Sequence, residues 1–210
     1  SRRIDLPIEW FSFGDWLRFH PELPYYEQGD DGKVSMVGKF PAMIKAIRDF
    51  DGKLINIHQT WLTIDGCKAP VKNPKQSLKL PSDEYSGGGS IHCGGLPADG
   101  ILFAAEGLET SLSVATVYEH PCWSLINATM LSLFTVNNPV HTVVVFADND
   151  ATETGVKKAL ELREKLAPMN IRVEIFYPPI VETDWNDVLC NQGSNFFPPV
   201  EDLQEFVAIS

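Results

Sequence analysis

Apolar runs alternate with segments of helical periodicity through the second half of the chain. The apolar runs are predicted to be strands: "GILFAAEG" (100–107), "CWSLINA" (122–128), "TVVVFADND" (142–150) and "IRVEIFYP" (171–178). The segments between them are predicted to be helices: "LETSLSVATVY" (108–118), "MLSLFTV" (130–136) and "TETGVKKALELREKL" (152–166). Continuous apolar strands separated by helices indicate a parallel sheet covered on both faces, an α/β fold.

The first half has a different pattern. "KLINIHQTWLTIDGCKA" (53–69) alternates apolar and polar residues, which predicts strands with Asp65-Gly66 at a hairpin turn. We expect a helix around "GDWLRFHP" (14–21) and a short strand or helix from Met43 to Arg48. Five glycines in residues 85–95 mark a boundary. The predicted division is therefore an α+β subdomain over 1–99, an α/β domain over 100–190 and a tail or helix over 191–210.

Charge is distributed unevenly along the chain. The formal net charge is −11, with 12 basic and 13 acidic residues in 1–99 but 5 and 15 in 100–210. This acidity argues against tight non-specific binding of duplex DNA, which depends on lysine and arginine, and it suits a carboxylate-lined cation site in the second half. The chain lacks an apolar run long enough for a membrane span, and its four scattered cysteines suit a cytoplasmic protein.

Carboxylates follow the predicted strands. Glu106, Asp148 and Asp150 lie where strands end, and the carboxyl ends of parallel strands meet at one edge of a sheet. Carboxylates gathered there would resist ionisation without a cation, and oxygen ligands alone select Mg²⁺ or Mn²⁺. Asp184 and Asp187 follow the last strand and can add to the same cluster. The alternative is that Asp150 and Asp184 cap helices, a role that suits aspartate.

A basic loop precedes the glycine-rich boundary. Residues 67–80 hold four lysines and no acidic residue: Lys68, Lys72, Lys75 and Lys79. These can steer an anionic strand toward the acidic edge, or they can form a solvated loop. Trp61 and Tyr85 are candidates for stacking on bases, although an aromatic residue beside apolar strand positions is more often part of the core.

Three motifs resemble the toprim domain of plasmid- and phage-type primases. They are "EGLETSLS" (106–113), "FADND" (146–150) and "DWNDVL" (184–189). Upstream, "RFHPELPYYE", "GKFPAMIKAIRD" and "LINIHQTWLTIDGCKAPVKNPK" resemble the segment before the toprim core in these primases, so the similarity covers roughly residues 15 to 190. The resemblance implies a primase catalytic core, with a toprim-like parallel sheet flanked by helices and preceded by a smaller α+β subdomain. It also implies synthesis of short RNA primers from ribonucleoside triphosphates on single-stranded DNA.

The resemblance assigns roles to individual residues. Glu106 would be the toprim glutamate, a metal ligand or proton-transfer group, and Asp148 and Asp150 would hold Mg²⁺ or Mn²⁺. Asp184 would complete the cluster and Asp187 would support it, while Glu109 would either orient Glu106 or, more in keeping with its position, lie on a solvated helix face. Nucleotide or template would contact the lysine loop (Lys68, Lys72, Lys75 and Lys79) and Thr129.

The chain departs from the family at several points. Family members often carry arginine where this chain has "GGGSIHCGG", so either His92 substitutes for it there or the site is altered. The zinc ribbon and the helicase module common in the family do not occur in this sequence, so a replicative helicase or a separate zinc ribbon is an expected partner. Two other functions fit the same carboxylates: a metal-dependent toprim nuclease, and a non-catalytic module that binds nucleotide or a replication protein.

Overall fold

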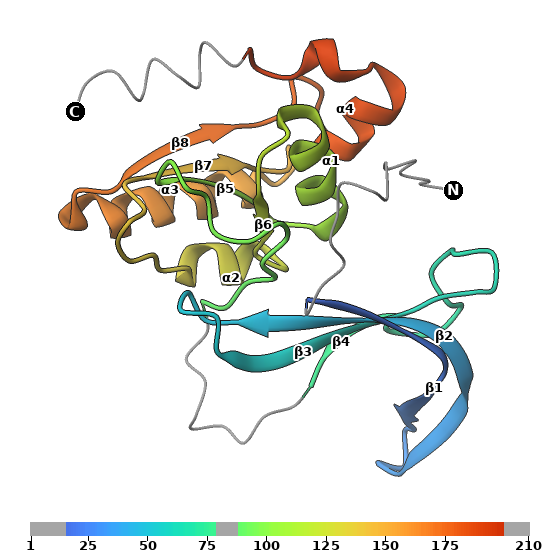
Figure 1. Ribbon diagram of the computed structural model, residues 1–210. Helices are drawn as coiled ribbons and strands as arrows, with labels where there is room; N and C mark the ends of the chain where they lie inside the picture. The colour runs from blue at the N-terminus through green and yellow to red at the C-terminus, as the bar shows by residue number, and fades with distance from the viewer. Residues whose placement is uncertain (1–15, 79–87, 200–210) are drawn as a thin grey trace.

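The computed structural model describes residues 16–78 and 88–199 (Figure 1). The strands are β1 (Leu17–Gln28), β2 (Val34–Arg48), β3 (Leu54–Trp61), β4 (Lys75–Ser77), β5 (Ile101–Ala105), β6 (Cys122–Ser124), β7 (Thr142–Phe146) and β8 (Arg172–Phe176). The α-helices are α1 (Leu108–Tyr118), α2 (Ala128–Leu133), α3 (Thr154–Leu166) and α4 (Trp185–Asn191). Short 3₁₀ helices follow at Ala167–Met169 and Ser194–Phe196.

The predicted parallel sheet is confirmed. Its strand order is β6-β5-β7-β8, and each neighbouring pair is parallel. From β5 the chain passes through α1 to β6 on one side and later returns to β7 on the other, so the order reverses between β5 and β7. Ligand sites of open α/β sheets lie beyond the carboxyl ends of the strands at such a reversal. Glu106 follows β5 and Asp148 follows β7, so both lie at this point.

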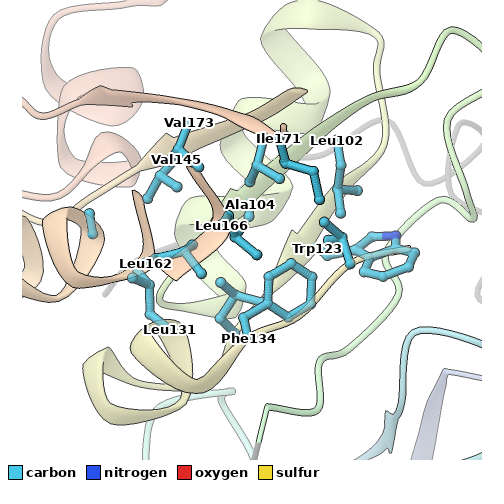
Figure 2. Close-up of a cluster of buried hydrophobic side chains, with 14 of the residues drawn as sticks. Leu102, Ala104, Trp123, Leu131, Phe134, Val145, Leu162, Leu166, Ile171 and Val173 are labelled. Atoms are coloured by element: carbon cyan, nitrogen blue, oxygen red, sulfur yellow. The ribbon is translucent and has the colours of Figure 1, made fainter. Parts of the chain in front are cut away.

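Both faces of the parallel sheet are covered by helices. Alternate strand residues pack one face against α2 and α3, where Leu131, Leu162 and Leu166 join Trp123 in a fully buried cluster (Figure 2). The intervening residues pack the other face against α1 and α4. Successive residues of a strand point to opposite faces of the sheet, and here both faces are covered. The strands therefore appear in the sequence as continuous apolar runs.

The first half forms an antiparallel sheet of order β1-β2-β3-β4, shown beneath the parallel sheet in Figure 1. The helix expected over 14–21 is wrong within the described residues, because β1 begins at Leu17 and pairs with β2. Pro21 and Pro24 suggested a stop, but an edge strand tolerates proline, and Pro21 lies in a register shift between His20 and Leu23. The hairpin turn at Asp65-Gly66 is confirmed by the bridge between Leu62 and Lys68.

Two consecutive residues connect the sheets. Ser90 exchanges backbone hydrogen bonds with Arg48 of β2, and Ile91 exchanges them with Ser124 of β6, at 2.8–3.0 Å. Ile91 also belongs to the apolar cluster between the antiparallel sheet and α1, which includes Ile47. The predicted boundary at residue 99 stays a prediction, but residues 90 and 91 contact both halves.

All four cysteines are free thiols; Cys93 and Cys122 are buried, and Cys67 and Cys190 are exposed. Within residues 16–78 and 88–199, no helix has the length and apolar character needed to cross a membrane.

Candidate active site

Asp148 is the centre of the acidic edge. Its Oδ1 atom is buried and has no hydrogen-bond partner. Burial raises the pKa of Asp148 to about 7, and the charges of Glu106, Asp184 and Asp150 add to the shift, while a hydrogen bond from the Thr110 side chain opposes it. The three other carboxylates therefore lie close enough to Asp148 to repel its charge, as the positions of the strand ends predict.

Glu106 lies at the bend between β5 and α1. Burial raises its pKa, the backbone of Ala128 hydrogen-bonds its carboxylate and lowers the pKa, and the charge of Asp150 raises it further. Ala128 is the first residue of α2, whose N-cap Asn127 accepts a hydrogen bond from the Met130 N–H at 3.0 Å. Thr129 is exposed in the same turn, so this candidate nucleotide residue lies in the turn that contacts Glu106.

Asp184 reaches the edge because Asn149 holds the loop before it. The Asn149 N–H donates to the Thr183 carbonyl at 3.1 Å, and its side-chain Nδ2 donates to the Pro178 carbonyl at 2.7 Å. Asp184 is the N-cap of α4 and forms a reciprocal capping box with Asp187: each carboxylate accepts the backbone N–H of the other, at 2.8 and 3.2 Å. The capping alternative is therefore correct for Asp184, and Asp187 supports Asp184 through this box.

Asp150 also takes the capping role. Its Oδ1 accepts hydrogen bonds from the backbone N–H groups of Thr152 (2.9 Å) and Thr154 (3.0 Å), and Oδ2 accepts from Gly155 at 3.4 Å. The hydrogen bond from the Thr152 side chain contributes most to holding the pKa of Asp150 below its usual value. Asp148 and Asp150 therefore differ physically: the first is an unsatisfied buried carboxyl, and the second is stabilised in its ionised form.

The donor set fits a hard divalent cation. Oxygen ligands without histidine or thiolate suit Mg²⁺ or Mn²⁺, and a cation would satisfy Asp148 Oδ1 and remove the repulsion among the carboxylates. Among the residues that the structure describes, no three His, Cys, Asp or Glu side chains are already grouped closely enough to hold a metal ion. Mg²⁺ typically takes only one or two protein carboxylates and completes its coordination with water and phosphate oxygens, so such a group is not required.

A basic cluster lies beside this edge. Lys75 of β4 forms an ion pair with Glu109 of α1 at 3.3 Å, so the expectation of a solvated Glu109 is wrong. Burial favours the neutral acid, but Lys75 and Lys45 hold the pKa of Glu109 below its usual value. Lys45 is almost fully buried and donates to Thr60 Oγ1 at 2.7 Å, and burial lowers its pKa to about 8.

The other lysines of the basic loop occupy different environments. Lys68 is exposed and pairs with Leu62 next to the Asp65-Gly66 turn. Lys72 is exposed, and its backbone N–H donates to Glu27 Oε1 at 2.9 Å. Lys79 lies outside the described residues. Among the three lysines of this loop that the structure describes, Lys75 is the one that forms an ion pair with the helix that follows Glu106.

His92 is not arranged as an exposed nucleotide ligand. Its ring stacks on Trp123 at 3.6 Å between centroids, and its Nε2 atom is buried without a partner. Burial and the nearby Arg48 lower the pKa of His92 to about 4, so the ring is neutral at pH 7. Trp61 is buried and packs edge-on against Tyr25, which confirms it as a core residue; Tyr85 lies outside the described residues.

Three residues that the sequence interpretation gave no role support the acidic edge. Thr110 is buried in the first turn of α1 and hydrogen-bonds Asp148. Asn149 fixes the loop that carries Asp184. Gly155, the second residue of α3, lies so close to Asp148 that an added Cβ would be 2.8 Å from the Asp148 carbonyl oxygen. Thr110 and Asn149 belong to the E-G-x-E-T and D-N-D motifs, whereas only the approach of α3 to β7 in the fold identifies Gly155.

Two parts of the chain match known family models. Residues 101–195 match the family model of the toprim domain, and residues 1–85 match that of a domain of unknown function, DUF7146. No curated protein matches the chain at a significant level.

Several solved structures have the same fold. A DNA primase domain from Pseudomonas aeruginosa superposes with a TM-score of 0.51 at 15% identity, over 89% of this chain and 56% of that one. The primase catalytic core of E. coli gives 0.53 at 14% identity, over 86% and 56%. A DnaG primase catalytic domain bound to single-stranded DNA gives 0.51 at 13% identity, over 80% and 54%. The chain thus spans little more than half of each of these structures.

Proposed function

Because residues 101–195 form a toprim domain in a chain with the fold of primase catalytic cores, we propose that this protein synthesises short RNA primers on a single-stranded DNA template. The reaction would be metal-dependent nucleotidyl transfer from ribonucleoside triphosphates. The observation that carries the proposal is Asp148, whose buried, unpartnered Oδ1 lies among Glu106, Asp150 and Asp184 at the strand-order reversal.

Asp148 and Glu106 are the residues best placed to hold the cation. Asp148 has an unsatisfied oxygen, and both carboxyls have raised pKa values that a positive charge would lower again. Asp184 and Asp150 add negative charge while their capping hydrogen bonds fix their positions. When bound, Mg²⁺ or Mn²⁺ would neutralise charge on the attacking and leaving oxygens.

Glu106 is also the group that can move a proton. Where Asp148 rather than Glu106 holds the cation, the raised pKa of Glu106 makes its carboxylate a better base than an exposed glutamate, and the attacking 3′-hydroxyl must lose a proton as the new phosphodiester bond forms. The Ala128 hydrogen bond orients the carboxylate for this step.

The lysines supply binding of phosphates. Lys75 lies across the interface from α1, and its ion pair with Glu109 positions the ammonium group beside the acidic edge. Lys68 and Lys72 are exposed and can contact phosphates of the template or the triphosphate. We therefore assign nucleotide contact first to Lys75. His92 is given no nucleotide-binding role, because its ring packs on Trp123.

The test is incubation of the protein with single-stranded DNA, labelled ribonucleoside triphosphates and Mn²⁺. We expect new short RNA from the wild type and none from Asp148→Asn, while Glu161→Gln, a matched change on the exposed side of α3, keeps full activity. A shortened template without RNA would identify a toprim nuclease instead. Binding of DNA and nucleotides with neither product would identify a non-catalytic module.

A further inference from the structure

One exposed aromatic side chain lies in line with Lys75. Phe19 of β1 is 67% exposed, although the strand it belongs to is packed on its neighbours. The strand pairing places it in one row across the sheet: Phe19 opposite Met43, Met43 opposite Thr60, and Thr60 opposite Lys75. Directly paired residues project from the same face of a sheet, so all four side chains share one face.

This face is the one that meets the toprim domain. Leu17, two residues before Phe19, packs with Ile47 against Leu112 of α1. Lys45, in the neighbouring row, is buried beneath the same interface. The row from Phe19 to Lys75 therefore begins at an exposed ring, passes Met43 and the buried Thr60, and ends at the Lys75–Glu109 ion pair.

The face is complementary in charge to a nucleic acid strand. The pairing places three exposed lysines on it, Lys39, Lys68 and Lys75, opposite Pro24, Leu62 and Thr60 respectively, while Lys45 on the same face is buried. The paired positions that the described strands assign to this face are not acidic, in a chain whose net charge is −11, and the one exposed acid in the register shift of β1 is the unpaired Glu22. Cations beside an exposed aromatic ring are the arrangement with which proteins bind single strands, because every base has a π face that can stack.

We propose that Phe19 stacks on a base of the single-stranded DNA template, a few nucleotides from the phosphate that Lys75 contacts. This inference deepens the proposed function and rests on it for the identity of the strand as template. Three strand spacings separate Phe19 from Lys75, about 14 Å at ~4.8 Å each. A stacked strand covers that span in roughly four nucleotides at about 3.4 Å per step, and an extended strand covers it in fewer.

The experiment measures binding of a fluorescein-labelled oligothymidylate by anisotropy, without metal or nucleotide. We expect Phe19→Ala and Phe19→Leu to weaken binding about five- to tenfold, near the lower end for loss of one base–aromatic stack, and Phe19→Tyr to bind as the wild type does. Phe196→Ala is the matched control, because that ring is also exposed (56%) but belongs to the 3₁₀ helix after α4. Far-ultraviolet circular dichroism checks that each variant is folded.

A second readout locates the contact. We expect one position of a 2-aminopurine probe moved along the oligonucleotide to be quenched by the wild type and by Phe19→Tyr, and not by Phe19→Leu. Unchanged binding by Phe19→Ala would overturn the proposal, as would full binding by Phe19→Leu, which keeps apolar area without a ring. Sedimentation that shows self-association of the wild type and its loss in Phe19→Ala, with unchanged DNA binding, would also overturn it, since the face would then bind a second copy.

These outcomes are separate from those of the primer assay. A wild type that binds DNA through Phe19 but makes no RNA would refute primer synthesis and leave the stacking contact standing. A wild type that makes RNA but binds DNA independently of Phe19 would refute the stacking contact alone.

Discussion

Replacement of Asp148 by asparagine should stabilise the metal-free protein at pH 8 while abolishing synthesis. The wild-type carboxyl has a folded pKa of about 7, against 3.8 for the unfolded chain. Between these values the folded state keeps a proton that the unfolded state has lost, so the free energy of unfolding falls as pH rises from about 4 to about 7. Asparagine does not titrate, so the variant loses this pH-dependent contribution.

The size of the effect follows from the shift. About three pKa units at 1.36 kcal/mol each set a ceiling of ~4 kcal/mol, and relaxation and water penetration at a partly exposed loop reduce the expected gain to about 2 kcal/mol. The difference should shrink toward zero below about pH 3, because Asp148 is then protonated in both of the wild type's states. The pKa of Glu106 is also raised, so the free energy of unfolding of the variant should still fall with rising pH, but less steeply than that of the wild type.

Urea unfolding in the presence of EDTA, at intervals from pH 4.5 to pH 8.5, measures this difference. Asp150→Asn is the matched control in the same loop: it should destabilise the protein by about 1 kcal/mol at pH 8, because the lost carboxylate accepts N–H groups at the start of α3. A constant offset between Asp148→Asn and wild type at every pH, or a less stable variant at pH 8, would refute the electrostatic explanation of the site.

Three further predictions concern the surrounding structure. Gly155→Ala should destabilise the protein by about 1–3 kcal/mol and strongly reduce primer synthesis, because the added Cβ would displace the Asp148 backbone. Urea unfolding measures the stability and the primer assay measures the activity. A variant that is both stable and active would contradict the close approach of Gly155 to Asp148. The Lys45 contribution to wild-type stability should rise by up to about 3 kcal/mol from pH 8 to pH 10.5, because the folded Lys45 loses its proton near pH 8 while the unfolded lysine keeps it to 10.5. The buried thiols of Cys93 and Cys122, whose pKa values are raised, lower the stability of wild type and variant alike above pH 9, so the contribution is measured as the difference between the two proteins. Lys45→Met should lack this rise in urea unfolding, and an identical rise in both would assign it to other groups. Magnesium at a hundredfold excess over its Kd should stabilise the wild type by about 2.7 kcal/mol at pH 8, and calorimetry should show no such gain in Asp148→Asn.

The sequence predicted the α/β half well because β5, β6 and β7 are buried on both faces. Short, continuous runs of β-branched and aromatic residues such as "TVVVF" strongly favour a strand, and this run forms β7. The predicted helix 108–118 coincides with α1. Strand β1 escaped prediction because Pro21 and Pro24 suggest an interruption, whereas a register shift on an edge strand accommodates them. The local conformational preference of this segment disfavours a continuous strand, but its hydrogen-bonded pairing with β2 overrides that preference.

The acidic residues were predictable as a group because parallel strands bring their carboxyl ends to one edge. Their individual states were not, since D-x-D does not reveal that the first aspartate would be unsatisfied and the second a helix cap. The contact between Lys75 and Glu109 joins residues 34 positions apart, so no local pattern encodes it. His92 was misjudged for the same reason, because its neighbour Trp123 comes from another strand.

The backbone hydrogen bonds of Ser90 and Ile91 connect the antiparallel sheet directly to the parallel sheet. Arg48 is hydrogen-bonded to Ser90, and Ser124 is hydrogen-bonded to Ile91, so Ile91 covers the outer edge of β6. Excision of residues 100–195 as an independent unit would strip that cover and leave β6 open to intermolecular pairing. The halves should consequently melt in a single cooperative transition, with the amide protons of Ser90 and Ile91 among the slowest to exchange.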